Sequence, residues 1–209
     1  MSWTIEKGNK ESKELSGLNA AVGKAKQENI LMLCAASDQG NSTALYCFPA
    51  ACGTCIRVGA STGTGEKCAW VHQKDYDILL PGENVPLDLG IGTLPTEHSG
   101  SSVATAIAAG FAGLIIYLDW FINPQDHKKP KRCSRFADKL EMQSMFAFLA
   151  SLGVKEFPRA AKLNDLAGKN WKIPKDQKAV KEGLQSFFRG FQVRSVEEAG
   201  HMLVSIGGI

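Results

Sequence analysis

The feature that most constrains this chain is a long apolar segment, Val103 to Phe121, which begins directly after the turn Ser99-Gly100-Ser101-Ser102. Apart from Asp119 the segment carries no charge, so we predict a helix that is buried or nearly so. Ser102 would lie in its first turn, where unpaired N–H groups and the positive end of the helix dipole favour a developing negative charge. Ser102 is therefore a candidate nucleophile. The competing interpretation is that Ser101 or Ser102 only caps the helix.

The same segment is also long enough to span a membrane, since a bilayer needs about 20 apolar residues. Its first half consists of Ala, Gly, Ser and Thr, which suit close packing inside a protein better than contact with lipid. We therefore predict a core helix and no membrane partner. The N-terminus, Met1 to Lys7, lacks the apolar stretch of a secretory signal, so we expect a cytoplasmic or otherwise intracellular protein.

The first half of the chain has the pattern of an α/β fold. Apolar residues at helical spacing predict a helix from about Ser12 to Glu28, which leads into the continuous apolar run Ile30–Ala36. Such a run after a helix is typical of a strand buried on both faces of a parallel sheet. A second strand is predicted around Thr54–Ala60, followed by an irregular Gly- and Pro-rich region over residues 82–101. Helix, strand, strand, loop and helix are consistent with one side of a doubly wound sheet.

Five motifs occur in the order found in one family of enzymes. They are Met1-Ser2-Trp3, Ala35-Ala36-Ser37-Asp38-Gln39-Gly40, Val58-Gly59-Ala60, Leu80-Pro81-Gly82 and Gly100-Ser101-Ser102-Val103-Ala104. Together they resemble the C-terminal half of a subtilisin-like serine peptidase (subtilase) domain over about residues 1–120. The resemblance implies an α/β subtilisin-like parallel sheet with flanking helices, present in part, and serine endopeptidase activity on a peptide or protein substrate.

The resemblance also implies roles for individual residues. Ser102 matches the catalytic nucleophile, and Asp38 matches the Asn that donates to the oxyanion. An ionised carboxylate accepts hydrogen bonds and cannot donate them, so Asp38 would form the oxyanion-side wall without supplying that donor. Ser2, Trp3 and Ser37 match positions that line the substrate cleft.

The other two triad residues are missing from the matched region. In the family the order is Asp, His, Ser, and the Asp and His precede the segment that Met1 to Trp3 resembles. Of the histidines, only His98 lies near Ser102 in sequence, which makes it a candidate for a substitute general base. We expect the isolated chain to be inactive, with the missing N-terminal half or a self-associated copy as candidate partners. The alternative is a non-catalytic interaction or regulatory module with the subtilase fold.

Six cysteines raise metal and disulfide alternatives. The spacing of Cys47, Cys52, Cys55 and Cys68 is similar to the spacing of cysteines that bind iron–sulfur clusters or zinc. Strand residues alternate between faces, so we expect these thiols not to converge. We predict reduced, mostly buried thiols, with no metal site and no cofactor.

Charge divides the chain unevenly. Residues 1–119 carry 8 Lys/Arg and 12 Asp/Glu, and residues 120–209 carry 16 and 9. We assign residues 1–122 to the subtilase half-domain, 123–135 to a basic linker and 136–209 to a helical extension. The basic run lacks interleaved aromatic residues, so we expect a solvated linker and no nucleic-acid partner. In the extension, one predicted helix carries an apolar stripe at Phe136, Leu140, Phe148, Leu149 and Leu152. Another carries Val180, Leu184, Phe187, Phe188 and Phe191.

Overall fold

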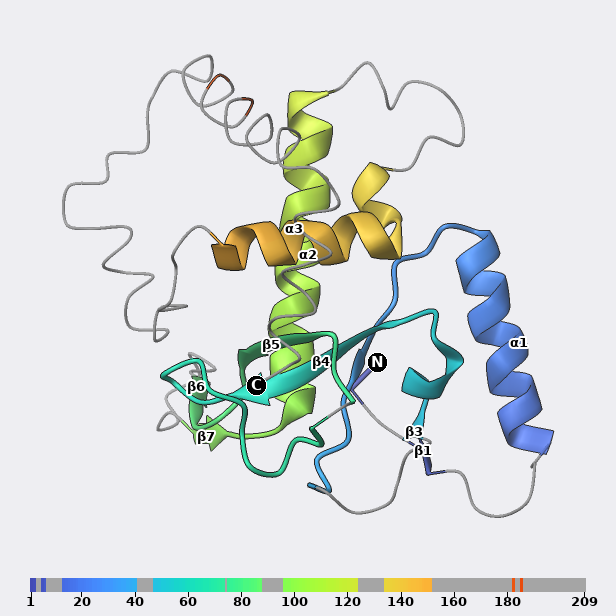
Figure 1. Cartoon of the computed structure of the whole chain (residues 1–209). Helices are drawn as coiled ribbons and strands as arrows, with labels where there is room; N and C mark the ends of the chain where they lie inside the picture. Colours follow the sequence, from blue (N-terminus) through green and yellow to red (C-terminus); the bar gives the residue numbers. More distant parts are fainter. Residues whose placement is uncertain are drawn as a thin grey trace.

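The protein is described from a computed structural model of the whole chain (Figure 1). The part described covers residues 1–2, 5–6, 13–40, 47–73, 75–87, 96–123, 134–151, 182 and 185. Trp3 and the predicted helix around Val180 to Phe191 lie outside these residues, except for two positions.

A three-stranded parallel sheet forms the centre of the fold. Its strands are β2 (Leu33–Ala35), β4 (Ile56–Ser61) and β5 (Ile78–Pro81), in the spatial order β2-β4-β5. Beside β2, the Met1 backbone adds one more set of pairings: its ammonium donates to the Leu33 carbonyl oxygen at 2.6 Å, and the Ala35 N–H donates to the Met1 carbonyl oxygen at 3.0 Å. The predicted parallel sheet is confirmed, and the first residues lie along its β2 edge.

Helix α2 (Ser101–Ile122) covers one face of the sheet (Figure 1). On the other face, Val22 of α1 (Lys13–Gln27) packs with Cys34 and Cys55, while most of α1 stands to the side of the sheet. The strand β4 alternates accordingly: Ile56, Val58 and Ala60 join the α2 side and are completely buried. This two-sided burial explains why the strand sequences read as continuous apolar runs.

Two small antiparallel pairs flank the central sheet. Strand β1 (Ile5–Glu6) pairs with β3 (Cys47–Phe48), which a short 3-10 helix, Ala50–Cys52, follows. Strand β6 (Val85–Leu87) pairs with β7 (Thr96–His98), and this hairpin ends two residues before α2. The region over residues 82–101, predicted to be irregular, therefore contains a hairpin that leads the chain to the serine turn.

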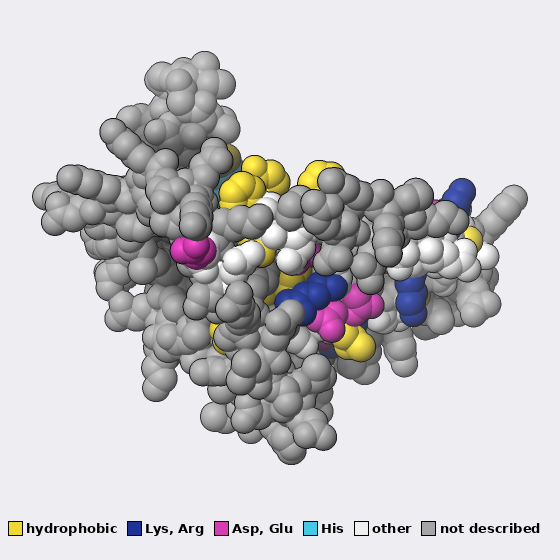
Figure 2. All heavy atoms as spheres, turned by 90° about the horizontal axis from the view of Figure 1, so that it is seen from above, with side chains coloured by type: hydrophobic (Ala, Val, Ile, Leu, Met, Phe, Trp, Pro, Cys, Tyr) yellow, Lys and Arg dark blue, Asp and Glu magenta, His cyan; other side chains and the backbone are white. Residues whose placement is uncertain are grey.

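Helix α2 is buried along one side and exposed along the other. Its buried side includes Ala104, Ala108, Ala112 and Ile115. The exposed large apolar side chains of its C-terminal half are Leu114, Tyr117, Trp120 and Phe121. By length and composition α2 could cross a membrane, with 33% of its most apolar window buried in the fold; a core helix meets the same criteria. Seen from above, the molecule does expose groups of hydrophobic side chains next to basic and acidic ones (Figure 2).

A turn and a third helix extend the same core beyond residue 133. The 3-10 helix Arg135–Ala137 places Phe136 in the core at 0% exposure, and α3 (Lys139–Ser151) crosses α2 and adds Met142, Met145 and Phe146 (Figure 1). The predicted stripe is wrong at Leu140, which is 69% exposed. The reason is that Phe136 belongs to a separate turn, so its spacing to Leu140 does not follow one helix.

Polar contacts fix both ends of this added segment. At the C-terminal end of α2, the buried Asp119 accepts from Ser134 Oγ at 2.7 Å and from Asn123 Nδ2 at 3.1 Å. At the start of α3, Asp138 Oδ1 accepts the Leu140 and Glu141 N–H groups, as an N-cap does.

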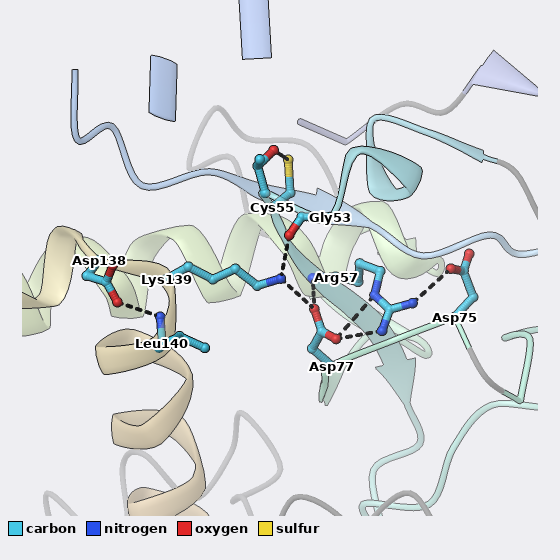
Figure 3. Close-up of polar contacts among 9 residues, drawn as sticks. Gly53, Cys55, Arg57, Asp75, Asp77, Asp138, Lys139 and Leu140 are labelled. Atoms are coloured by element: carbon cyan, nitrogen blue, oxygen red, sulfur yellow. Dashed lines mark hydrogen bonds and ion pairs between the residues drawn. The ribbon is translucent and has the colours of Figure 1, made fainter. Parts of the chain in front are cut away.

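Lys139, the first residue of α3, joins the helix to the sheet. Its Nζ donates to the Gly53 carbonyl oxygen at 3.0 Å and lies 3.9 Å from Asp77 Oδ2 (Figure 3). The Asp77 carboxylate also binds the Arg57 guanidinium, with Nη2 2.6 Å from Oδ1. This charged network spans β4, the residue before β5, and α3.

Candidate active site

The serine turn lies where α2 begins. Gly100 precedes the helix with φ 138°, a conformation that favours glycine, and its N–H donates to the Gly82 carbonyl oxygen at 2.7 Å. Ser102 follows in the first turn and is partly exposed. Among the described residues, no hydrogen bond engages the Ser102 hydroxyl. The hydroxyl is thus presented at the positive end of a 22-residue helix.

Asp38, three residues after β2, contacts the same helix terminus. Its Oδ2 accepts the Ser101 N–H at 2.8 Å, and its Oδ1 accepts the Ser101 hydroxyl proton at 2.5 Å. The Asp38 carboxylate therefore satisfies one of the unpaired N–H groups of the first turn and places a negative charge where the helix dipole favours it. The structure brings together the strand end and the serine turn that the sequence comparison paired.

Ser101 is a residue whose role the sequence did not reveal. Its side chain is completely buried, and its Oγ also accepts the Ala60 N–H of β4 at 3.1 Å. The Ser101 hydroxyl thus links β4 to the Asp38 carboxylate and ties two strand ends to α2. The sequence offered Ser101 or Ser102 only as a possible helix cap, but Gly100 occupies the N-cap position, so neither serine caps the helix.

Gly100 separates Asp38 from Ser102. A Cβ atom at Gly100 would lie 3.2 Å from Asp38 Oδ2 and 3.3 Å from Ser102 Oγ. The carboxylate and the candidate nucleophile therefore lie on either side of one backbone residue. In the first turn of α2, the Ser101 N–H donates to Asp38 and the Val103 N–H donates to the Gly100 carbonyl oxygen. The backbone N–H of Ser102 is therefore the donor of this turn that could face an oxyanion.

The other predicted site residues that the structure describes are Ser2, Ser37 and the candidate base His98. Ser37 is buried, and its carbonyl oxygen accepts the His72 N–H at 3.4 Å. Ser2 is exposed next to Met1. His98 is exposed on β7, where its Nε2 lies 3.0 Å from Thr96 Oγ1. Neither of the two histidines within the described residues is hydrogen-bonded to Ser102.

The cysteine motif divides between the two faces of the sheet. Cys68 belongs to the core on the α2 side, whereas Cys55 belongs to the cluster that Val22 of α1 joins. Within the described ranges, no group of three or more His, Cys, Asp and Glu side chains could hold a metal ion.

Gly82 controls the approach of the serine turn to the sheet. A Cβ atom there would lie 2.7 Å from the Ala60 Cβ and 2.8 Å from the Gly100 carbonyl oxygen. We expect Gly82→Ala to lower the free energy of unfolding by roughly 1–3 kcal/mol, the usual cost of overpacking, measured by urea denaturation. Gly63→Ala is the matched control, because its Cβ would meet nothing within 4 Å. Equal stabilities for the two variants would contradict the close approach.

The comparisons with known proteins agree with this arrangement. Residues 1–130 match the subtilase family of peptidases. Among solved structures, the prenylagaramide maturation protease PagA superposes with a TM-score of 0.52 at 24% identity, covering 72% of this chain and 50% of that one. The PatG macrocyclase domain superposes with a TM-score of 0.51 at 20% identity, covering 70% and 41%.

At these identities the two structures show a shared fold, and the chain spans half of their length or less. No curated protein matches the sequence. The family match covers more than half of the chain and includes the strands, the turn at Gly82 and the serine turn at the start of α2. The chain belongs to the subtilase family.

Proposed function

We propose that this chain contributes the nucleophile-bearing half of a serine endopeptidase site, with Ser102 as the nucleophile and a peptide as the substrate. The observation that carries the proposal is the position of Ser102 in the first turn of α2. Its side chain is partly exposed and has no hydrogen bond within the described residues, and the neighbouring Ser101 is held by Asp38. Subtilase family membership supports the same chemistry.

In the proposed reaction, Ser102 Oγ attacks the carbonyl carbon of the scissile bond and gives its proton to a general base. The Ser102 N–H and the start of α2 then face the oxyanion of the tetrahedral intermediate. Asp38 supports this geometry indirectly: its carboxylate holds Ser101, and Ser101 holds the end of β4. Asp38 is thus a positioning residue in this proposal.

The base and its orienting carboxylate are proposed to come from outside this chain. A serine without a base is a weak nucleophile, so the isolated chain should hydrolyse peptide substrates at or near background. The exposed apolar side chains on α2 support a partner that covers this helix. Such a partner is the N-terminal half of a subtilase domain, or a second copy of the chain.

The test is labelling by a fluorophosphonate probe. We expect slow labelling of the chain alone, and faster labelling of Ser102 when an N-terminal subtilase half carrying the Asp and His is supplied. Ser102→Ala should abolish the labelling. Ser99→Ala, at an exposed hydroxyl bonded to Asn84, is the matched control and should leave it unchanged.

Two results would count against this assignment. Rapid labelling of the chain alone that His98→Ala removes would show a base within the chain. No labelling even with the added half would favour the non-catalytic interaction module.

A further inference from the structure

A second group of reactive side chains lies on the face of the sheet opposite to Ser102's helix. Cys34 of β2 and Cys55, which immediately precedes β4, are both 0% exposed and belong to one cluster with Val22 and Ala50. Because Cys34 is paired in register with Arg57, Cys34 and Cys55 lie diagonally across neighbouring parallel strands on the same face. Two thiols far apart in sequence therefore lie on one face of the sheet, in the cluster that Val22 of α1 joins.

The two thiols differ in acidity. A hydrogen bond from Cys34 lowers the pKa of Cys55 to about 7, with a further contribution from the Thr54 hydroxyl, whose oxygen is 4.0 Å from the sulfur. The same contact raises the pKa of Cys34, as does burial. Cys55 is thus the thiol of the pair that ionises more readily, and Cys34 is the one that stays protonated.

A third cysteine lies toward solvent. Cys52 stands three residues before Cys55, is partly exposed, and its thiol donates to Asn19 Oδ1 at 3.0 Å. Between them, Gly53 turns the chain with φ 69°, and Cys55 lies beside this turn at the start of the strand that carries Arg57 (Figure 3). Cys52 has an acceptor of its own, whereas Cys34 and Cys55 belong to one buried cluster and shift each other's pKa.

We propose that Cys34 and Cys55 form a redox site, a dithiol that peroxide oxidises to a disulfide joining β2 to the start of β4. The Cys55 thiolate attacks one oxygen of hydrogen peroxide, which forms a sulfenic acid and releases hydroxide. The Cys34 sulfur then attacks the sulfenic sulfur, forms the S–S bond and displaces hydroxide, which leaves as water with the Cys34 proton. The hydroxide released in the first step takes up the proton that Cys55 lost when it ionised. The two thiols thus lose two electrons, and the peroxide is reduced to two molecules of water. This site does not depend on Ser102 or on any peptidase activity.

The experiment uses the full chain, oxidised with hydrogen peroxide, alkylated after unfolding and analysed by mass spectrometry. We expect two thiols to escape alkylation and one linked peptide pair containing Cys34 and Cys55. Oxidation should quicken as the pH rises through about 7, because the Cys55 thiolate is the attacking species. Cys34→Ser should stop the reaction at a sulfenic acid on Cys55, which dimedone traps.

Cys68→Ser is the matched control: Cys68 is also buried, burial raises its pKa to about 11, and it lies on the other face of the sheet. This variant should form the disulfide at the unchanged rate. Circular dichroism before oxidation verifies that both variants fold. A Cys52–Cys55 linkage, full alkylation after peroxide, or a zinc ion found by native mass spectrometry on these thiols would each overturn the proposal.

Discussion

Phe136→Ala is expected to lower the free energy of unfolding by about 3–5 kcal/mol, the range for removing a buried phenylalanine side chain. Phe136 is 0% exposed within the core that α2 and α3 share, and the Arg135 guanidinium lies 4.5 Å above its ring. Urea denaturation followed by tryptophan fluorescence measures the change.

Leu140→Ala is the control for this experiment, because Leu140 is 69% exposed four residues later and its truncation should cost little. The family match ends at residue 130, so a large effect at Phe136 would show that the core of this protein continues past the matched region. A loss below about 0.5 kcal/mol, within the range of ordinary surface substitutions, would mean that α3 packs loosely and contributes little to the fold.

Asp38→Ala is expected to lower the free energy of unfolding by roughly 2 kcal/mol. Hydrogen bonds to a charged group contribute about 1.5–3 kcal/mol each, and the exposure of Asp38 to solvent reduces the sum of the two. The substitution removes both acceptors of Ser101, whose hydroxyl is completely buried. Glu97→Ala, at an exposed carboxylate on β7, should change stability by less than about 0.5 kcal/mol.

A double-mutant cycle of Asp38→Ala and Ser101→Ala tests the contact directly. The two changes should not be additive, because both remove the hydrogen bond from the Ser101 hydroxyl to Asp38 Oδ1, whereas Ser101→Ala keeps the bond from the Ser101 N–H to Oδ2. Strict additivity would mean that Asp38 does not stabilise the fold through the Ser101 hydroxyl.

Much of this architecture could be predicted from sequence, because it follows from burial. The helix expected over residues 12–28 and the strand expected over 54–60 are observed at Lys13–Gln27 and Ile56–Ser61. A strand that is buried on both faces of a sheet appears in the sequence as a continuous run of apolar residues. Such a run can be recognised without knowing the tertiary structure. The proximity of Asp38 to the serine turn likewise came from motif order, which carries the topology of a family.

Other features depend on which residues pair between strands and on where each helix begins, and the linear sequence does not specify either. The contact between Cys34 and Cys55 requires the pairing of β2 with β4, and spacing alone suggested a different set of cysteines. The hairpin of β6 and β7 was missed because Pro86, Glu97 and His98 give it little strand propensity. Leu140 was placed in the core because the break between the 3-10 turn and α3 shifts the helical phase.

The Asp119 carboxylate has a consequence for the connection between α2 and α3. It holds Asn123 at one end of this connection and Ser134 at the other, so both ends are fixed to one carboxylate at the C-terminal end of α2. The entropy of closing a loop rises slowly with its length, by about 0.6 kcal/mol for each doubling. Insertions between Asn123 and Ser134 should therefore lower the free energy of unfolding only slightly. Evolution or engineering can add sequence at this point without disturbing the core.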